Sequence, residues 1–207
     1  MVAGAAVTAL VAAGAISYAV AEDHGGGSGA GSVLRVPAAD SADAGFARDM
    51  AVHHQQAVEM SYIVRDRTRD PEVRRLAYDI AQTQANQRGM LLGWLDLWGL
   101  PKVSADPPMT WMGMGDAPAG KDGALMPGMA TNAELRELGR LSGRKAEIDY
   151  LRLMTAHHRG GVHMAEGCAA RCSVGVERRL AQGMVQAQRS EIQLMADMLK
   201  KRGAAIS

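Results

Sequence analysis

Residues 50–60, MAVHHQQAVEM, recur as MTAHHRGGVHM at residues 154–164. Each copy places a His-His pair between two methionines, and a small residue, Ala57 or Gly161, follows the pair. The second copy comes 104 residues after the first, and at that offset the ungapped match continues beyond the histidines, so that the tetrapeptide RRLA also occurs twice. The chain therefore contains an internal duplication, and two copies are too few for a solenoid.

The first copy lies in a predicted helical hairpin. Its apolar residues recur at three- and four-residue steps, which predicts a helix over about residues 42–67. Asp70 followed by Pro71 is typical of a capped helix start, and a second helix runs from there until Gly99 stops it. Two helices joined by a short turn form an antiparallel hairpin.

The second copy lies in an equivalent hairpin. Thr131 and Glu134 have the spacing of a capping box, which begins a short helix to about Leu141. A third long helix then ends near Ser173, a fourth covers about residues 175–202, and no stretch alternates convincingly as a strand. We therefore predict an all-α protein, an antiparallel four-helix bundle of two duplicated hairpins with a long Met-rich crossover and a short extra helix.

The N-terminal residues predict export. Residues 2–20 are almost wholly apolar and uncharged, and the Ala-Val-Ala sequence ending at Ala21 resembles a signal-peptidase site. The segment is either removed or kept as a single membrane anchor, which makes the protein periplasmic, extracellular or membrane-tethered. We expect a signal peptide or anchor at 1–21, a flexible Gly-rich tether at 22–40 and a bundle domain at 41–203. Within the bundle domain, a Met-rich connection at 101–130 joins a hairpin at 41–100 to a hairpin at 131–203.

The composition excludes some classes of partner. The formal charge is +1 and the apolar fraction is 47%, so the chain carries neither the basic excess of a nucleic-acid-binding protein nor the polarity of a disordered one. The 14 methionines and single phenylalanine predict a core of aliphatic side chains and methionine. Because methionine is both a flexible core residue and a soft ligand, its abundance alone has two interpretations.

The duplicated histidines and methionines indicate a metal site. On a helix, Met50 lies within about one turn of both His53 and His54, so thioether and imidazole can converge on one point. Neutral imidazole suits copper, zinc, iron and nickel, whereas a thioether selects Cu(I) because both are soft. Burying unpaired imidazoles in both copies would be costly without a ligand role. We therefore expect copper, chiefly Cu(I) but also Cu(II), as the bound ion.

Further candidate ligands lie outside the two pairs. The crossover offers Met112, Met114, Met126 and Met129, which a polar, Gly-rich loop leaves without a core to fill. Cys168 and Cys172 are either two thiolate ligands one helical turn apart or a local disulfide, which would need a turn because a regular helix gives poor geometry. Val64 and Thr68 are their equivalents in the first copy, so the thiols are not part of the duplicated function.

Two kinds of catalysis are disfavoured by the motifs. Di-iron chemistry in a four-helix bundle needs Glu-x-x-His sequences, and none occurs, since Glu59 follows its His pair and Glu166 follows His163. The spacing of the residues does not indicate a Ser, His and acid set of the kind that hydrolases use. Ser61, which follows the first phrase, has no serine at the equivalent position of the second copy. We therefore expect a binding protein and not an enzyme. The alternatives are a helical interaction or structural module with a polar histidine core and, less favoured, a metal-dependent oxidase.

The doubled His-His phrase, with Met-Pro-Gly-Met at residues 126–129 leading into its second copy, resembles the CopM-like family of exported domains of unknown function. The resemblance covers roughly residues 41–203 and implies a ferritin-like bundle and, for some members, periplasmic copper binding and copper resistance. This chain departs from the commoner pattern in having His163 where a Glu is usual, and in its nearby cysteines, so that His163 and the cysteines are either added ligands or local variation. The ligands implied position by position are Met50, His53, His54, Met60, Met154, His157, His158 and Met164.

The resulting hypothesis is an exported protein that binds copper for buffering, resistance or transfer to another copper protein or transporter. Its partners are a copper ion and such a protein, with no nucleic acid. The repeat leaves one question open, because the two His-His pairs can face each other across the core or lie on opposite sides of it.

Overall fold

The computed structural model describes residues 36–115 and 120–205. Residues 1–35, which hold the expected signal or anchor and most of the tether, lie outside this part of the chain. The described residues contain no strand. Their helices are α1 (Ala42–Arg67), α2 (Pro71–Leu97), the short 3-10 turn η1 (Thr110–Met112), α3 (Asn132–Arg140), α4 (Gly143–Arg171) and α5 (Gly175–Lys201).

The helix starts follow from local capping. The Ser41 side chain accepts a hydrogen bond from the first turn of α1, and Asp70 does the same for α2, where Pro71 follows it. Thr131 and Glu134 form the capping box that begins α3. Side-chain caps therefore position three of the helices before any packing between them is considered.

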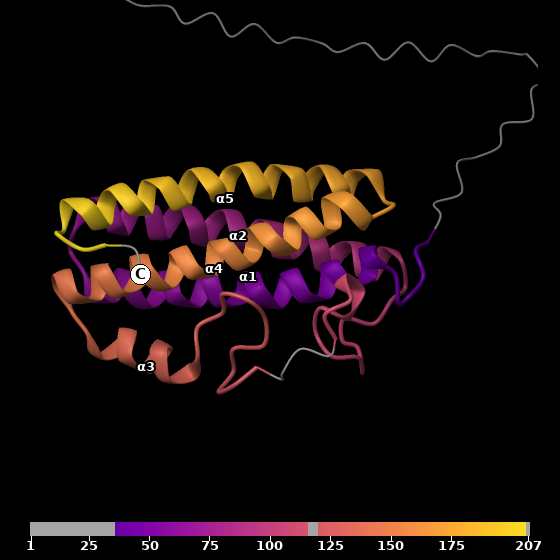
Figure 1. The fold of residues 1–207 in the computed structure, drawn as a ribbon, viewed down its shortest axis with the longest axis horizontal. Coiled ribbons are helices and arrows are strands. Elements are labelled where there is room, and N and C mark those ends of the chain that lie inside the picture. The colour runs from indigo at the N-terminus through magenta and orange to yellow at the C-terminus, as the bar shows by residue number, and fades with distance from the viewer. Residues whose placement is uncertain (1–35, 116–119, 206–207) are drawn as a thin grey trace, which may run out of the picture. The chain divides into compact units, whose positions relative to one another are not determined.

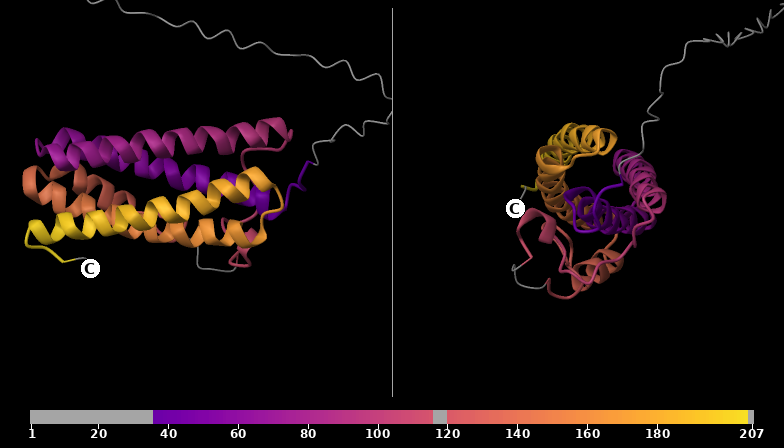
Figure 2. Two further views of the ribbon diagram at one scale, coloured as in Figure 1. Left: turned by 90° about the horizontal axis from the view of Figure 1, so that it is seen from above. Right: turned by 90° about the vertical axis from the view of Figure 1, so that its right-hand side faces the viewer.

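Two helical hairpins make up the bundle, as the sequence predicted. The helix α1 packs mainly on α2, α4 packs mainly on α5, and the hairpins meet where α1 packs against α4. Figure 1 shows α1 and α4 side by side and running in opposite directions, and the end-on view in Figure 2 shows the four long helices around a common axis. The prediction of an all-α four-helix bundle is confirmed.

Each interhelical turn is held by an acidic residue from the other hairpin. Asp43, near the start of α1, accepts hydrogen bonds from the backbone N–H groups of Ser173 at 2.9 Å and Val174 at 2.7 Å, between α4 and α5. Glu147, its equivalent in α4, accepts a hydrogen bond of 2.6 Å from the hydroxyl of Thr68, between α1 and α2. The duplication has thus produced two equivalent helical hairpins and, in addition, an acidic contact from each hairpin to the turn of the other.

The crossover is fastened along α1. The Asp49 carboxylate accepts hydrogen bonds from the Met109 N–H at 2.7 Å and the Trp111 indole N–H at 2.9 Å. The Gln56 side chain makes two hydrogen bonds, of 2.8 and 2.7 Å, with the backbone of Ala130. The crossover and α3 consequently lie on the side of the bundle formed by α1 and α4 (Figure 1).

The methionines of the crossover do have a core to fill, so that premise of the sequence argument is wrong. Met126 is 6% exposed, and Met109, which the sequence argument left out, is 3% exposed. Both belong to a buried cluster with Phe46 and Met50, and three more crossover methionines pack against it: Met112, Met114 and Met129. The crossover therefore covers one end of the bundle core.

None of the helices in residues 36–115 and 120–205 combines the length and the apolar character needed to cross a membrane.

Substitution of Gly160 tests how closely the crossover must approach α4. A Cβ atom added at Gly160 would collide with the carbonyl oxygen of Pro127. We expect Gly160→Ala to lower the free energy of unfolding by about 1–3 kcal/mol, because the loop must move away. Gly183→Ala, at an exposed position of α5 with open space around it, should raise it by about 0.5–1 kcal/mol.

Urea denaturation of the two variants and the wild type measures these differences. Equal stability of Gly160→Ala and Gly183→Ala would contradict the close approach of the loop to α4.

Candidate metal centre

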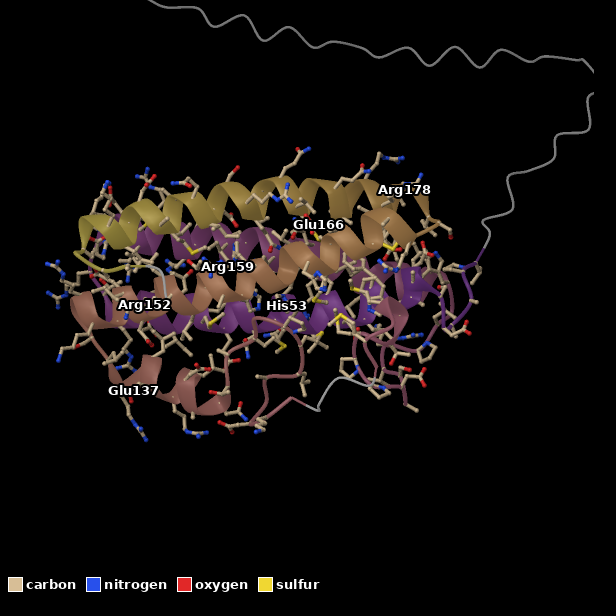
Figure 3. The ribbon with its side chains drawn as sticks, in the orientation of Figure 1. His53, Glu137, Arg152, Arg159, Glu166 and Arg178 are labelled. Carbon is tan, nitrogen blue, oxygen red and sulfur yellow. A yellow bond between two sulfur atoms is a disulfide. The ribbon has the colours of Figure 1, made fainter. Side chains whose placement is uncertain are left out.

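Four buried histidines form a layer across the middle of the bundle. His53 and His54 are 0% exposed, as is His158, and His157 is 1% exposed. The rings of His53 and His157 stack with centroids 3.8 Å apart and planes tilted by 33°. Figure 3 shows His53 midway along the bundle, where α1 and α4 meet. The two His-His pairs therefore face each other, which settles the question that the repeat left open. We call these four residues the His layer.

Each imidazole of the His layer uses Nε2 to contact an oxygen atom. His53 Nε2 donates to the Pro127 carbonyl at 3.2 Å, and His157 Nε2 donates to the His53 carbonyl at 3.0 Å. His54 Nε2 lies 2.9 Å from the Gln87 side-chain oxygen, and His158 Nε2 lies 2.6 Å from a Glu191 carboxylate oxygen. Because carbonyl and carboxylate oxygens only accept, these contacts favour a proton on Nε2, and a neutral ring then carries its lone pair on Nδ1.

The four Nδ1 atoms are buried and have no hydrogen-bond partner. An unpartnered buried polar atom costs about 1–3 kcal/mol, so four of them in one layer are expensive for a purely structural core. A metal-binding histidine has this arrangement, with one nitrogen free for the metal and the other donating to a carbonyl or carboxylate. The His layer is thus prepared to offer imidazole nitrogen atoms to a cation.

Sequence reasoning missed the side chains that orient the outer two histidines. Gln87 follows His54 by 33 residues, and Glu191 follows His158 by the same 33 residues. The duplication therefore places them at equivalent positions of α2 and α5. Comparing the copies at the fixed offset would have found them. The difference between an amide and a carboxylate makes the two halves of the layer electrostatically unequal.

Two glutamines extend the polar layer. Gln84 and Gln188 are equivalent in the two copies and are only 2% and 4% exposed. Both amide atoms of Gln84 and the side-chain oxygen of Gln188 have no hydrogen-bond partner. A Cβ atom at Gly161 would collide with Gln188, so the small residue after the second His pair makes room for this amide. The two glutamines are not among the residues that the sequence predicted for the site.

The methionines of the two phrases lie in pairs on either side of the His layer. Met50 and Met164 belong to one buried cluster, and Met60 and Met154 belong to the other, and all four are 0% exposed. Because α1 and α4 are antiparallel, each pair contains one methionine from each copy. Each cluster therefore contains two thioethers, one from each copy, and we call Met50 with Met164 and Met60 with Met154 the methionine pairs.

His163 and the two cysteines, also candidate ligands, lie away from the His layer. His163 is exposed on α4. Cys168 and Cys172 form a disulfide, so in this state neither is a thiolate ligand (Figure 3). The bond is possible because α4 ends at Arg171 and Cys172 has an extended backbone. The crossover methionines join the cluster that contains Met50 and Met164.

The His layer is not a preformed four-histidine cage. In the described part of the chain, the one set of three ligating atoms from His, Cys, Asp or Glu within 4.8 Å of one another comes from Cys168, Cys172 and Glu177. No three imidazole nitrogen atoms of the layer approach that closely. An ion held there needs further ligands beside imidazole, and the methionines of the two phrases are buried thioethers in the clusters on either side of the layer.

The domain of unknown function DUF305 matches residues 43–199. The chain belongs to the DUF305 family. No curated protein matches it.

Solved structures of DUF305 proteins resemble this one. A protein from Streptomyces coelicolor, named as a putative secreted DUF305 protein, is 74% identical, with a TM-score of 0.77 over 82% of this chain and 99% of its own. A DUF305 fragment from Deinococcus radiodurans is 31% identical, with a TM-score of 0.65 over 77% of this chain and 96% of its own.

CopM, solved in a Cu(I)-bound form, is 20% identical, with a TM-score of 0.58 over 77% of this chain and 96% of its own. Cu(II)-bound and Ag-bound forms of CopM match similarly. At this identity the likeness concerns the fold. CopM-like membership, expected from the His-His phrases, is confirmed by the family match and these structures.

The buried histidines predict acid sensitivity of the metal-free DUF305 bundle. Burial lowers the pKa of His53 from 6.5 to about 4, and burial together with the neighbouring His53 lowers the pKa of His54 to about 3. Well above pH 6.5, the side chains of His53 and His54 are neutral in the folded and in the unfolded protein. Below it, the unfolded chain binds protons that the folded one does not, so the free energy of unfolding falls as the pH drops toward about 4.

Urea denaturation between about pH 7.5 and about pH 5 measures this loss. His54→Gln should lose less stability on acidification than the wild type, whereas His163→Ala, at an exposed position, should behave like the wild type. An identical pH slope for His54→Gln and the wild type would contradict the assignment.

Proposed function

We propose that this protein binds copper, preferentially Cu(I), as cargo at the His layer and its flanking methionine pairs. The observation that carries the proposal is the set of four buried Nδ1 atoms without partners, each on a ring whose other nitrogen contacts an oxygen. Neutral imidazole and thioether together favour copper over zinc or iron, and the thioether favours the Cu(I) state. Cu(II) would rely on the imidazole nitrogen atoms.

Two equivalent binding positions fit the geometry better than one central ion. No three imidazole nitrogen atoms of the layer lie within 4.8 Å of one another, whereas a methionine pair lies on each side of the layer. Cu(I) accepts few ligands, so imidazole and thioether groups from one side can satisfy it. The duplication then supplies the second position.

The role that follows is storage or transfer of copper outside the cytoplasm. Full burial of the ligands suits holding an ion away from water and oxidants, which serves copper buffering, resistance or delivery to a copper protein or transporter. A relative is named as a putative secreted protein, and residues 2–20 have the character of an export signal or a membrane anchor. We propose an exported binding protein without catalytic activity.

Anaerobic titration with Cu(I) against a chromophoric chelator tests the proposal. Replacement of His53, His54, His157 and His158 by Ala should abolish tight binding. Met50→Leu combined with Met164→Leu removes two thioethers at nearly constant volume and should weaken Cu(I) binding at one of the two positions by at least about tenfold, while the position beside Met60 and Met154 keeps its affinity and the bundle stays folded. The matched control is Met198→Leu, at a buried methionine of α5 outside the two phrases.

The results separate the proposal from the structural alternative. A histidine network with only a structural role predicts that the fourfold variant loses helical circular dichroism while the Met50 and Met164 variant binds Cu(I) like the wild type. Weak binding by the wild type, or equal affinity of the two methionine variants, would contradict the copper site.

A further inference from the structure

The turn between α4 and α5 carries a polar cluster that the equivalent turn lacks. Cys168, Cys172 and Glu177 occupy positions that are Val64, Thr68 and Val73 in the first copy. Val64 and Val73 are both 0% exposed, so apolar side chains fill these places in the core at the other end of the bundle. Packing alone therefore does not account for an acid at the position of Glu177.

Glu177 is buried beside a second carboxyl group, that of Asp43. Its side chain is 0% exposed, and neither carboxylate oxygen has a hydrogen-bond partner. Burying a carboxyl group in this way is costly, and burial followed by the charge of Asp43 raises its pKa from 4.5 to about 9. The cost is avoided in the first copy, where the equivalent residue is a valine.

The carboxyl group points at the two sulfur atoms. One oxygen of Glu177 and the Sγ atoms of Cys168 and Cys172 all lie within 4.8 Å of one another. The cysteines are 0% and 3% exposed. Three groups that can ligate a metal thus lie close together in the core, roughly 15 Å along α4 from the His layer.

The turn does not depend on the disulfide for its position. Asp43 binds the N–H groups of Ser173 and Val174, which follow directly after Cys172. These hydrogen bonds hold the end of α4 against the start of α5. The same arrangement holds the other turn through Glu147 and Thr68, where no disulfide exists. The two cysteines and Glu177 should therefore stay together after reduction.

We propose that reduction of the Cys168–Cys172 disulfide creates a zinc site from the two thiolates and the Glu177 carboxylate. A dithiol reductant supplies two electrons and two protons, the S–S bond breaks to give two thiols, and the reductant becomes a disulfide. A Zn²⁺ ion then binds the two sulfur atoms and one carboxylate oxygen, and the displaced protons pass to solvent.

The donor set assigns zinc in preference to Cu(I). Zinc is bound by cysteine sulfur and by carboxylate oxygen alike, whereas Cu(I) prefers soft donors and gains little from a carboxylate. The site differs from the His layer in residues, position and oxidation-dependence. The two proposals therefore stand or fall independently.

Co²⁺ is the probe, because thiolate ligation of Co²⁺ produces strong charge-transfer absorption that histidine or carboxylate ligation does not. The whole protein is titrated with Co²⁺ in its oxidised form and, without oxygen, after reduction by dithiothreitol and removal of the reductant. We expect the absorption only in the reduced form, saturating at one equivalent, and its loss when Zn²⁺ is added.

Glu177→Val introduces the residue of the first copy and should weaken Co²⁺ and Zn²⁺ binding by at least about tenfold, while Cys168→Val with Cys172→Thr should abolish the absorption. In the reduced wild type, Zn²⁺ should also protect both cysteines from alkylation, which needs no variant. Absence of the absorption and of protection in the reduced wild type would overturn the site. Unchanged affinity in a folded Glu177→Val would overturn the role of Glu177, and failure of Zn²⁺ to displace Co²⁺, with displacement by Cu(I) instead, would overturn the zinc assignment.

Discussion

The stacking of His53 on His157 determines how the two hairpins meet. Bringing two imidazoles face to face in the core requires α1 and α4 to approach closely, and the two glycines that follow the second His pair make room for the crossover at Pro127 and for the side chain of Gln188. The crossover must then pass over this His53–His157 contact, since the Pro127 carbonyl accepts a hydrogen bond from His53. The packing of the helices, the path of the loop and the chemistry of the layer therefore depend on one contact.

The duplication supplies a symmetric frame on which the two halves have diverged. Asp43 and Glu147 occupy equivalent positions and each accepts a hydrogen bond from the turn of the opposite hairpin, Asp43 from backbone N–H groups and Glu147 from a hydroxyl. Gln87 and Glu191 occupy equivalent positions beside the His layer but differ in charge. The largest divergence is the position shared by Val73 and Glu177, where one half of the protein is apolar and the other carries a buried acid. Divergence of this kind marks where chemistry has been added to a frame that is already stable.

Local signals predicted the helices well because caps and periodicity act over a few residues. Ser41, Asp70 and the Thr131 capping box begin helices where expected. The sequence could not predict that the two His-His pairs face each other, since this depends on the orientation in which the two hairpins pack. The crossover methionines were misjudged because a loop without periodicity does not reveal that it covers a core.

The central claim is that the imidazoles of the His layer and the phrase methionines share a Cu(I) ion. X-ray absorption spectroscopy of the protein loaded anaerobically with Cu(I) measures the atoms bound to copper directly. The account predicts a mixed set of imidazole nitrogen and thioether sulfur, unchanged by the oxidation state of the distant disulfide. A copper environment with no sulfur, or one with sulfur and no imidazole nitrogen, would contradict it.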